Sequence, residues 1–405
     1  MVPDPSSTIA VVGASLAGLR AAESLRAAGH TGTITLIGAE PHLPYDRPPL
    51  SKQFLAGTWG LDRVLLRPAD KITALGLDLR LGHHAGALDV ERHTLELDDG
   101  AVVRFDGLVL ATGAHPRHLR GAPPLAGVHT LRTLEDSIEL GRVAAVDGAR
   151  VVVVGAGFIG SEVAATCRGR GASVTVVEAL PEPLARVLGV EMGAACAALH
   201  AAHGVDLVAG TGVTGFEDAG GRVRGVRLDD GRVIEADAVV VGIGVVPTTD
   251  WLEGAGLEID DGVVADATLH AADDVVVAGD VARWFDETLG AHIRIEHWTN
   301  AAEQGATAAR NLLAGRAQAA PYVSVPYFWS DQYDVKIQVI GHPGPDDEIA
   351  VVDGSTAERR FVALYGRQGR FTAALGFSRP RQLMGYRPLL EAGASFDEAR
   401  AHRPG

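Results

Sequence analysis

Cysteine and lysine are both scarce in this chain of 405 residues. Only Cys167 and Cys196 occur, both in stretches of helical character, and there is no CxxC pair. We therefore expect two buried, apolar thiols and no disulfide framework. Lysine appears only as Lys52, Lys71 and Lys336, which we attribute to coding bias because arginine supplies the other basic side chains. That scarcity makes Lys52 worth noticing.

The chain also lacks an excess of positive charge and any long apolar run. A net charge of −15 opposes binding to nucleic acid or to an anionic membrane, because both demand clustered positive charge. No apolar run approaches the roughly 20 residues that cross a bilayer. The run over residues 8–12 is too short for a signal peptide and has no basic flank. We expect a cytoplasmic protein that binds neither nucleic acid nor membrane.

Metal ligands are sparse despite the fifteen histidines. Only His200 and His203 sit at a spacing that suits two ligands, and zinc would need further ligands beside them. We therefore predict no metal site.

The order of apolar runs indicates several domains. Strand-like and helix-like runs alternate from Thr8 to about Val241, as in a doubly wound parallel sheet. Two hairpins interrupt them, at residues 88–105 and 222–234, and antiparallel strands follow from about Pro321. The fold class we predict is α/β, with two Rossmann-like nucleotide-binding domains and a C-terminal α+β domain. The expected boundaries are 1–113 with 245–320, then 114–244, then 321–405.

The most informative motif is a glycine-rich fingerprint that occurs twice. In the second copy a buried strand over residues 151–154 leads into a turn and a helix. Glu178, eighteen residues after Gly160, closes the next strand, residues 173–177. Its glycines permit a tight turn, close approach to a pyrophosphate and close helix packing. Glu178 would accept bonds from a ribose 2′-OH and repel a 2′-phosphate, which favours NADH over NADPH. The binding residues of this copy are Gly155, Gly157, Phe158, Ile159 and Gly160.

The first copy has the same layout with one departure. A strand over residues 8–12 precedes a helix from about Leu16 to Ala28, and Glu40 ends the next strand, residues 34–37. Ser15 replaces the middle glycine, although its hydroxyl could donate to a phosphate oxygen. The residues of this copy are Gly13, Ala14, Ser15, Leu16, Ala17 and Gly18. Two complete copies indicate a protein that passes electrons between two nucleotides.

Three further strands end in glycine-rich turns, where open α/β sheets bind ligands. They close on Ala111-Thr112-Gly113, Gly242-Ile243-Gly244 and Ala278-Gly279-Asp280. Asp280 could hold a ribityl hydroxyl, or it could be the N-cap of a following helix. From the residues alone both interpretations stay open.

Four other stretches give the chain a family resemblance. They are residues 44–52 (PYDRPPLSK), 131–136 (LRTLED), 294–300 (RIEHWTN) and 328–332 (FWSDQ). With the two fingerprints, they resemble pyridine-nucleotide-dependent FAD reductases of the glutathione-reductase superfold, specifically the ferredoxin reductases that serve bacterial cytochrome P450s and aromatic-ring dioxygenases. The resemblance covers nearly the whole chain, and Ser15 is its chief departure.

The resemblance implies two cofactors, FAD and NADH, and places residues at each. FAD would bind residues 1–113 and 245–320, and NADH would bind residues 114–244. Beside the first fingerprint, the implied FAD residues are Glu40, Arg47, Lys52, Ala85, Ala111, Thr112, Gly113, Arg132, Gly279, Asp280, His297 and Trp298. Beside the second, the implied NADH residues are Glu178, Arg186, Gly242, Ile243 and Gly244.

Lys52, Glu162 and Trp298 are the catalytic residues that the resemblance implies. Lys52 would stabilise the reduced flavin. Glu162 would face Lys52 near the nicotinamide and help align the nicotinamide with the flavin. Without the resemblance, Lys52 is better interpreted as a surface lysine that starts a helix. Glu162 could act only on the dipole of its helix, on whose first turn we expect it. Trp298 and Trp329 could line an exit for electrons, although core packing suits Trp329 better.

The implied reaction is hydride transfer from NADH to FAD, followed by single-electron transfer to an iron–sulfur ferredoxin that supplies a P450 or ring-hydroxylating oxygenase. An NADH oxidase, peroxidase or disulfide reductase is the alternative enzyme, and its redox cysteine would belong at residues 47–52, where none occurs. A redox-sensing flavoprotein is the non-enzyme alternative. We expect a monomer or weak homodimer. Candidate arginines for steering an acidic ferredoxin are Arg283, Arg294, Arg359, Arg360, Arg379 and Arg381.

Overall fold

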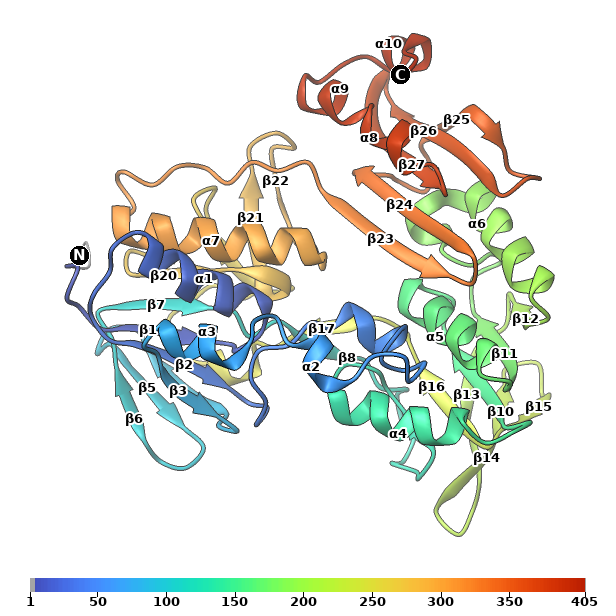
Figure 1. Cartoon of the computed structure of the whole chain (residues 1–405), viewed down its shortest axis with the longest axis horizontal. Coiled ribbons are helices and arrows are strands. Elements are labelled where there is room, and N and C mark those ends of the chain that lie inside the picture. The colour runs from blue at the N-terminus through green and yellow to red at the C-terminus, as the bar shows by residue number, and fades with distance from the viewer. Residues whose placement is uncertain (1–3, 405) are drawn as a thin grey trace. The chain divides into compact units, whose positions relative to one another are not determined.

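The computed structural model describes residues 4–404 as two compact units, each with its own parallel sheet (Figure 1). The first unit holds the chain up to Asp46 together with Leu61–His115 and Val245–Ser324. The second holds Arg47–Gly60, Pro116–Gly244 and the chain from Val325 onward.

The first unit is built on a six-stranded sheet whose strands are parallel except at one edge. Its order is β19 (His270–Ala272), β20 (Val275–Val277), β7 (Gly107–Leu110), β1 (Ile9–Val12), β2 (Ile34–Gly38) and β3 (Asp78–Leu81). Every residue of β1, β2, β7 and β20 is buried. These strands are apolar runs with little alternation, as expected for a sheet that is covered on both faces. Only β19 pairs antiparallel.

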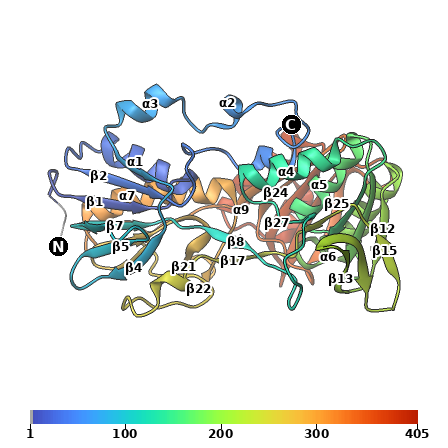
Figure 2. The same ribbon diagram turned by 90° about the horizontal axis from the view of Figure 1, so that it is seen from below.

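Two helices and a small sheet cover the central sheet of this unit. Helices α1 (Leu16–Ala27) and α7 (Trp298–Ala314) lie side by side on one face, and β4 (Ala85–Asp89), β5 (Thr94–Leu97) and β6 (Val102–Arg104) lie on the other (Figures 1 and 2). A Cβ on Gly305 of α7 would lie 2.2 Å from the Ala17 carbonyl oxygen of α1, so only glycine allows this approach. The remaining elements are α2 (Leu61–Val64), α3 (Ala69–Ala74), η2 (Asp250–Leu252), β18 (Val263–Ala265), η3 (Gly279–Val281), β21 (Ala282–Asp286) and β22 (Ala291–Ile293). The short strands β8 (Ala114–Pro116) and β17 (Val245–Pro247) pair with each other.

The second unit contains a five-stranded parallel sheet. Its order is β12 (Asp206–Ala209), β11 (Ser173–Glu178), β10 (Arg150–Val154), β16 (Ala238–Val241) and β9 (Val128–His129). The helices here are η1 (Pro48–Ser51), α4 (Leu134–Ala144), α5 (Phe158–Gly169) and α6 (Ala185–Ala202). A three-stranded antiparallel sheet is made of β13 (Val213–Ala219), β14 (Arg222–Leu228) and β15 (Val233–Glu235).

An antiparallel sheet near the C-terminus completes this unit. Its order is β23 (Tyr327–Gln332), β24 (Val335–Gly341), β27 (Arg370–Phe377), β26 (Arg360–Arg367) and β25 (Glu348–Ser355), followed by α8 (Pro380–Met384), α9 (Arg387–Glu391) and α10 (Phe396–Ala401). Leu188 and Met192 of α6 share one apolar core with Ile337, Tyr365 and Phe377 of the sheet. Residues 116–244 and 325–404 lie in this one compact unit, and the domain boundaries expected from the sequence stay a prediction.

The predicted α/β fold class is confirmed, as are the two hairpins and the antiparallel C-terminal strands. One detail differs: β2 ends at Gly38, so Glu40 lies in the loop after the strand and does not end it. Among residues 4–404, no helix combines the length and the apolar character that crossing a membrane requires.

Candidate functional site

The first glycine turn joins β1 to α1. Gly13 has φ of +119°, and a Cβ there would lie 2.0 Å from the Ala111 carbonyl oxygen at the end of β7. A Cβ on Gly18 would lie 1.9 Å from the Gly13 carbonyl oxygen. Both positions therefore require glycine. The turn packs backbone against backbone, which is how a Rossmann unit opens its helix N-terminus toward a pyrophosphate.

Ser15 occupies the N-cap of α1, where the fingerprint has its middle glycine. Its backbone is extended, with φ −118° and ψ −156°, and its side chain makes no capping hydrogen bond. Gly157, the N-cap of α5, is also extended, with φ −72° and ψ −179°. Because any residue adopts this conformation, serine causes no backbone strain here. A hydroxyl that does not cap the helix suits donation to a phosphate oxygen.

The segment after β2 brings Glu40 and Ala85 to the same end of the first sheet. The Tyr45 hydroxyl donates a hydrogen bond to the Glu40 carboxylate. The Gly82 N–H donates to the Glu40 carbonyl oxygen at 3.1 Å, and Ala85 follows as the first residue of β4. Glu40 is thus held at the carboxyl end of the strand next to β1, where a ribose hydroxyl binds in dinucleotide folds.

The second glycine turn joins β10 to α5 and repeats the first. Gly155 has φ of +97°, and a Cβ there would lie 2.4 Å from the Gly242 carbonyl oxygen. A Cβ on Gly160 would lie 2.1 Å from the Gly155 carbonyl oxygen, whereas one on Gly157 meets no atom within 4 Å. Gly157 therefore opens the turn where a pyrophosphate would approach, and a side chain would fill that space. Phe158 and Ile159 begin α5.

Glu178 is the last residue of β11, as predicted, and it is anchored on the second turn. Its Oε2 accepts a hydrogen bond from the Ala156 N–H at 2.7 Å, and its Oε1 accepts one from the Leu180 N–H at 2.9 Å. An ionised carboxylate has about four lone-pair sites, so Glu178 keeps capacity for two ribose hydroxyls. Arg186, an exposed residue of α6, lies in the same unit.

The second unit contains a largely buried ion pair between Lys52 and Glu162. The Lys52 Nζ lies 2.6 Å from Glu162 Oε2, and the two side chains are only 10% and 6% exposed. Lys52 follows the 3₁₀ turn over residues 48–51, whose two prolines fix the chain path. Lys52 is therefore not a surface lysine.

Glu162 is the fifth residue of α5, so the expectation that it lies on the first helical turn is wrong. The helix begins at Phe158 and its first turn holds no acidic residue. Dipole stabilisation falls off within the first turn. The buried ion pair with Lys52 accounts better for the position of Glu162.

Three hydroxyl side chains surround this pair, and the sequence did not single them out. Ser51 Oγ donates to Glu162 Oε2 at 2.5 Å, and Ser330 Oγ donates to Glu162 Oε1 at 2.8 Å. Thr166 Oγ1 donates to the Ser51 carbonyl oxygen at 2.7 Å. Ser51 and Ser330 both lie inside stretches that carried the family resemblance, which was the available signal.

Arg47 and Arg132, both implied at the flavin, come together in the second unit. Arg47 Nη1 donates to the Arg132 carbonyl oxygen at 2.5 Å. The Arg132 N–H donates to Asp136 Oδ2 at 2.8 Å, and Thr133 and Asp136 form a capping box that starts α4. The capping box fixes the backbone of Arg132, and Arg132 in turn fixes Arg47.

Trp298 begins α7, with His297 as its N-cap, in the first unit. Its indole Nε1 donates to Asp46 Oδ1 at 2.7 Å. Trp329 lies in the second unit, where its ring stacks on Tyr327 at a centroid distance of 5.9 Å. The indole of Trp298 is thus oriented by a carboxylate, whereas the aromatic contact of Trp329 is a packing contact.

The turns after β7 and β20 shape the rest of the first unit's site. Asp280 lies inside the 3₁₀ turn η3 and a strand follows it, so it is not the N-cap of a helix. The Gly279 N–H donates to Gln304 Oε1 of α7 at 2.9 Å, which fixes the residue before Asp280. In the turn after β7, Thr112 Oγ1 donates to the Thr248 carbonyl oxygen at 3.0 Å, and Gly113 follows with φ of +69°.

Both cysteines are buried inside helices, as predicted. Cys167 and Cys196 are 0% exposed, and burial raises the pKa of each thiol to about 12. A thiol must lose its proton to act as a nucleophile. These cysteines therefore suit packing and not the thiol chemistry of a disulfide reductase or peroxidase.

His200 and His203, the two histidines whose spacing suits a pair of ligands, both lie in the second unit. His200 is buried with its Nδ1 2.7 Å from the Tyr333 hydroxyl and its Nε2 3.3 Å from Ser161 Oγ, and burial lowers its pKa to about 4. His203 Nε2 instead lies 3.2 Å from Asp334. The two side chains therefore have separate polar partners, while the Tyr333 ring packs against both of them.

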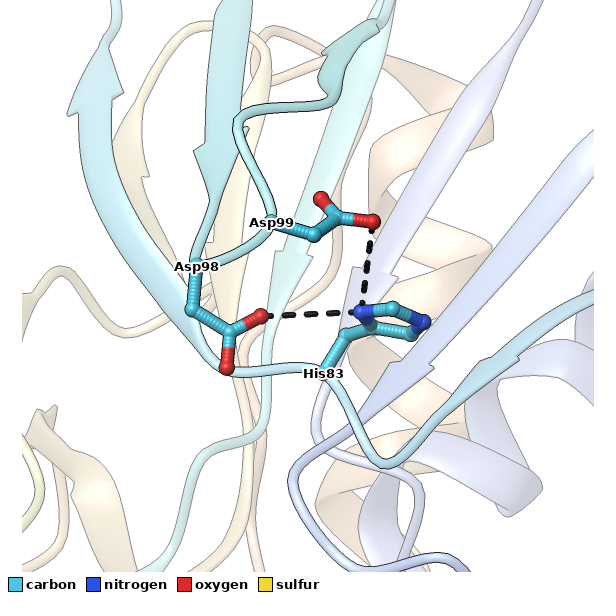
Figure 3. A group of neighbouring side chains, drawn as sticks. All are labelled: His83, Asp98 and Asp99. Atoms are coloured by element: carbon cyan, nitrogen blue, oxygen red, sulfur yellow. Dashed lines mark ion pairs between the residues drawn. The ribbon is translucent and has the colours of Figure 1, made fainter.

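His83, Asp98 and Asp99 form a small surface cluster in the first unit (Figure 3). Asp98 and Asp99 each place a carboxylate oxygen 3.5 Å from His83 Nδ1, and all three side chains are at least 34% exposed. The His84 N–H holds the pKa of the Asp98 carboxyl below its usual value. Exposed pairs of this kind contribute little to stability.

Comparisons with known proteins agree with this geometry. Residues 7–305 match the pyridine nucleotide-disulphide oxidoreductase family, and residues 327–405 match a reductase C-terminal family. The chain is 41% identical to the anthranilate 1,2-dioxygenase system ferredoxin–NAD(+) reductase component of Burkholderia cepacia over 398 residues, which cover 97% of this chain and 96% of the relative. It is 39% identical to rhodocoxin reductase of Rhodococcus erythropolis, over 95% of this chain and 89% of the relative.

Among solved structures, the chain resembles putidaredoxin reductase in its covalent complex with putidaredoxin. The TM-score is 0.92 at 32% identity, and the match covers 98% of this chain and 96% of that chain. The resemblance to ferredoxin reductases of oxygenase systems is therefore confirmed. The chain belongs to the pyridine nucleotide-disulphide oxidoreductase family.

Proposed function

We propose that this protein is an FAD-dependent NADH:ferredoxin oxidoreductase. It takes a hydride from NADH and delivers single electrons to an iron–sulfur ferredoxin that supplies a P450 or a ring-hydroxylating oxygenase. The observation that carries the proposal is the pair of glycine turns, each built on its own parallel sheet with an acidic residue at the end of the next strand or two residues after it. Two such turns allow one chain to bind two dinucleotides, and the names of the relatives agree with electron transfer between them.

The FAD site is proposed to combine the first turn with residues from several loops. Gly13 and Gly18 allow the backbone to approach a pyrophosphate, and the Ser15 hydroxyl is a donor for it. FAD, when bound, supplies the change from two-electron to one-electron chemistry. The other residues proposed for this site are Ala14, Leu16, Ala17, Glu40, Arg47, Lys52, Ala85, Ala111, Thr112, Gly113, Arg132, Gly279, Asp280, His297 and Trp298.

The NADH site is proposed to combine the second turn with the ends of neighbouring strands. Glu178 is held with its carboxylate on the turn itself, where it binds ribose hydroxyls and disfavours a 2′-phosphate. This predicts a preference for NADH over NADPH. The other residues proposed for this site are Gly155, Gly157, Phe158, Ile159, Gly160, Arg186, Gly242, Ile243 and Gly244.

Lys52 and Glu162 are proposed as catalytic residues with opposite charges. The ammonium group of Lys52 stabilises negative charge that develops nearby, and the carboxylate of Glu162 orients the amide end of the nicotinamide. The ion pair restrains both side chains, and little of either is accessible to water. Trp298, fixed by Asp46, is the third proposed catalytic residue.

The acceptor is proposed to be an acidic ferredoxin that docks on arginines. Arg283, Arg294 and Arg379 already pair with acidic neighbours. Arg360 and Arg381 are exposed, so they are the better candidates for steering. Reversing both charges should slow ferredoxin reduction at low salt, and unchanged kinetics would exclude these two residues as the docking site.

We further propose that the protein works in the cytoplasm as a monomer or weak homodimer, apart from membranes and nucleic acids. The cytoplasm holds the NADH that the proposed reaction consumes. A net charge of −15 disfavours contact with phosphate backbones and anionic lipids.

Rapid mixing under anaerobic conditions tests the proposed function. The purified flavoprotein is mixed with NADH and separately with NADPH, and the bleaching of the flavin is followed before a ferredoxin is added. Fast bleaching that prefers NADH, followed by rapid reoxidation by the ferredoxin, is the expected result. Bleaching that oxygen or peroxide reverses but ferredoxins do not would favour the oxidase, and slow turnover with every acceptor would favour a redox sensor.

A further inference from the structure

The strand β23 lies along helix α5 within the second unit. Its residues Phe328, Ser330 and Gln332 share one face of the strand, because side chains alternate along a strand. Phe328 packs edge-on against Phe158, with ring centroids 4.7 Å apart. One helical turn further along α5, Ser330 reaches Glu162. The strand thus contacts the helix through an aromatic pair and through a hydrogen bond to the carboxylate.

The two oxygens of Glu162 receive their hydrogen bonds from different parts of the chain. Oε2 accepts from Lys52 Nζ at 2.6 Å and from Ser51 Oγ at 2.5 Å. Oε1 accepts from Ser330 Oγ at 2.8 Å. A carboxylate held through one oxygen can still rotate about its Cγ–Cδ bond, whereas donors on both oxygens fix its plane.

Ser330 has a single hydroxyl hydrogen, and its surroundings direct that hydrogen toward Glu162. Ser330 and Gln332 are both 0% exposed. The Gln332 Nε2 donates to Ser330 Oγ at 3.2 Å, so the serine oxygen is an acceptor from the amide and a donor to the carboxylate. The Gln332 Oε1 is buried and has no hydrogen-bond partner among residues 4–404. A buried amide that satisfies only one of its ends is costly, which is unexpected for a residue that serves packing alone.

We propose that Ser330 is a positioning residue for Glu162 and that Gln332 orients the Ser330 hydroxyl. The C-terminal sheet would then set the plane of the carboxylate in the Lys52–Glu162 pair. This inference rests on the proposed role of Glu162 beside the nicotinamide. Ser330 acts through Glu162 and touches no substrate in this proposal.

The test compares four variants of the intact flavoprotein: Ser330→Ala, Gln332→Met, Glu162→Ala and the double variant Ser330→Ala with Glu162→Ala. The limiting rate of flavin reduction by NADH is measured by rapid mixing. The dissociation constant for NAD⁺ and the flavin midpoint potential are measured at equilibrium, and the urea midpoint reports folding. Misplacing a positioning group slows a reaction more than it weakens binding, so we expect Ser330→Ala to reduce the limiting rate about 10-fold and to change NAD⁺ affinity by less than about 3-fold.

Ser161→Ala is the matched control. Ser161 is also 0% exposed and is the neighbour of Glu162 in α5, but its hydroxyl contacts His200. Ser161→Ala also removes a serine hydroxyl close to Glu162, and we expect less than about a 2-fold change in the limiting rate. Gln332→Met removes the amide but keeps a side chain of similar shape. It should slow reduction about 3-fold without lowering the urea midpoint, a combination that a purely structural role would not produce.

The double variant decides whether Ser330 acts through Glu162. The inference holds if Ser330→Ala has no further effect on the rate once Glu162 is alanine. It is overturned if the two effects multiply, or if Ser330→Ala matches Ser161→Ala while Glu162→Ala is slow. If Glu162→Ala is itself as fast as the unmodified protein, then the proposed role of Glu162 fails and the inference falls with it. Reduction of ferredoxin by that variant would show that the proposed overall reaction nevertheless stands.

Discussion

The two glycine turns of this protein share one backbone geometry, but their acidic residues are held by different hydrogen bonds. In both, a glycine with positive φ presses against a neighbouring strand end, and a second glycine packs on the first. The acidic residues differ: Glu40 is bonded by the Tyr45 side chain from the following loop, whereas Glu178 is bonded by the N–H of Ala156 within its own turn. The backbone geometry of both turns therefore follows from the glycines, but the placement of each carboxylate depends on its local surroundings.

The second unit also carries a buried ion pair supported by hydroxyl groups. Lys52 and Glu162 come from segments that are 110 residues apart, and Ser330 comes from a third segment. Burying charge is unfavourable unless each charge is paired and hydrogen-bonded. The second unit thus combines a nucleotide turn with a charged centre that several segments must assemble.

The largest expected effect comes from adding a methyl group to the first glycine of either turn. Gly13→Ala should yield protein that purifies without flavin, and Gly155→Ala should keep flavin that NADH no longer reduces, because each Cβ would overlap a carbonyl oxygen. The absorbance ratio of flavin to protein and rapid mixing with NADH are the measurements. Gly100→Ala and Gly231→Ala are matched controls, since both have positive φ but no atom within 4 Å of the added Cβ. A Gly13→Ala protein with full flavin content would contradict the assignment of FAD to the first turn.

The next effect concerns the ion pair. Lys52→Met leaves the Glu162 carboxylate without its counter-charge in a site where the side chain is 6% exposed, and it should lower the free energy of unfolding by about 3 kcal/mol. Urea denaturation of the flavoprotein measures this. Lys336→Met is the control in the same unit: Lys336 pairs with Asp331 at 2.6 Å but is 46% exposed, so it should cost less than about 1 kcal/mol. Equal losses would argue that the Lys52 pair is no more important than a surface pair.

A smaller effect separates the two acidic residues. Glu178→Gln should reduce the preference for NADH over NADPH about 10-fold, because the amide no longer repels a 2′-phosphate. Glu40→Gln should leave that preference unchanged and weaken FAD binding instead. Rates of flavin reduction at several concentrations of both nucleotides give the ratio. A shift of the ratio in Glu40→Gln would mean that the assignment of nucleotides to turns is reversed.

The smallest effect concerns Ser15, the only side chain by which the first turn departs from the fingerprint. Ser15→Gly should raise the dissociation constant for FAD about 3-fold, because one hydrogen bond to a phosphate oxygen is lost while the extended N-cap backbone is unstrained with either residue. Fluorescence titration of the deflavinated protein measures this. A loss of more than about 10-fold would make the hydroxyl a principal phosphate ligand.

The order of strands and helices and the positions of both turns could be predicted from the sequence, because they depend on local patterns. Apolar runs, glycine spacing and a following acid report a strand, a turn and a helix within about 30 residues. The end of β11 at Glu178 and the presence of antiparallel strands after about residue 321 were predicted on the same basis. The helical location and the burial of both cysteines follow the same logic.

Contacts between distant segments were decided only by the tertiary structure. The pairing of Ser330 with Glu162, the anchoring of Trp298 by Asp46 and the core shared by α6 and the C-terminal sheet join residues far apart in the chain. Periodicity cannot report such contacts, because it describes which face of an element is buried and not which side chain meets it. The amino-acid sequence by itself determined two dinucleotide turns, while folding determined which charges and hydroxyls surround them, since those groups meet only when the elements pack.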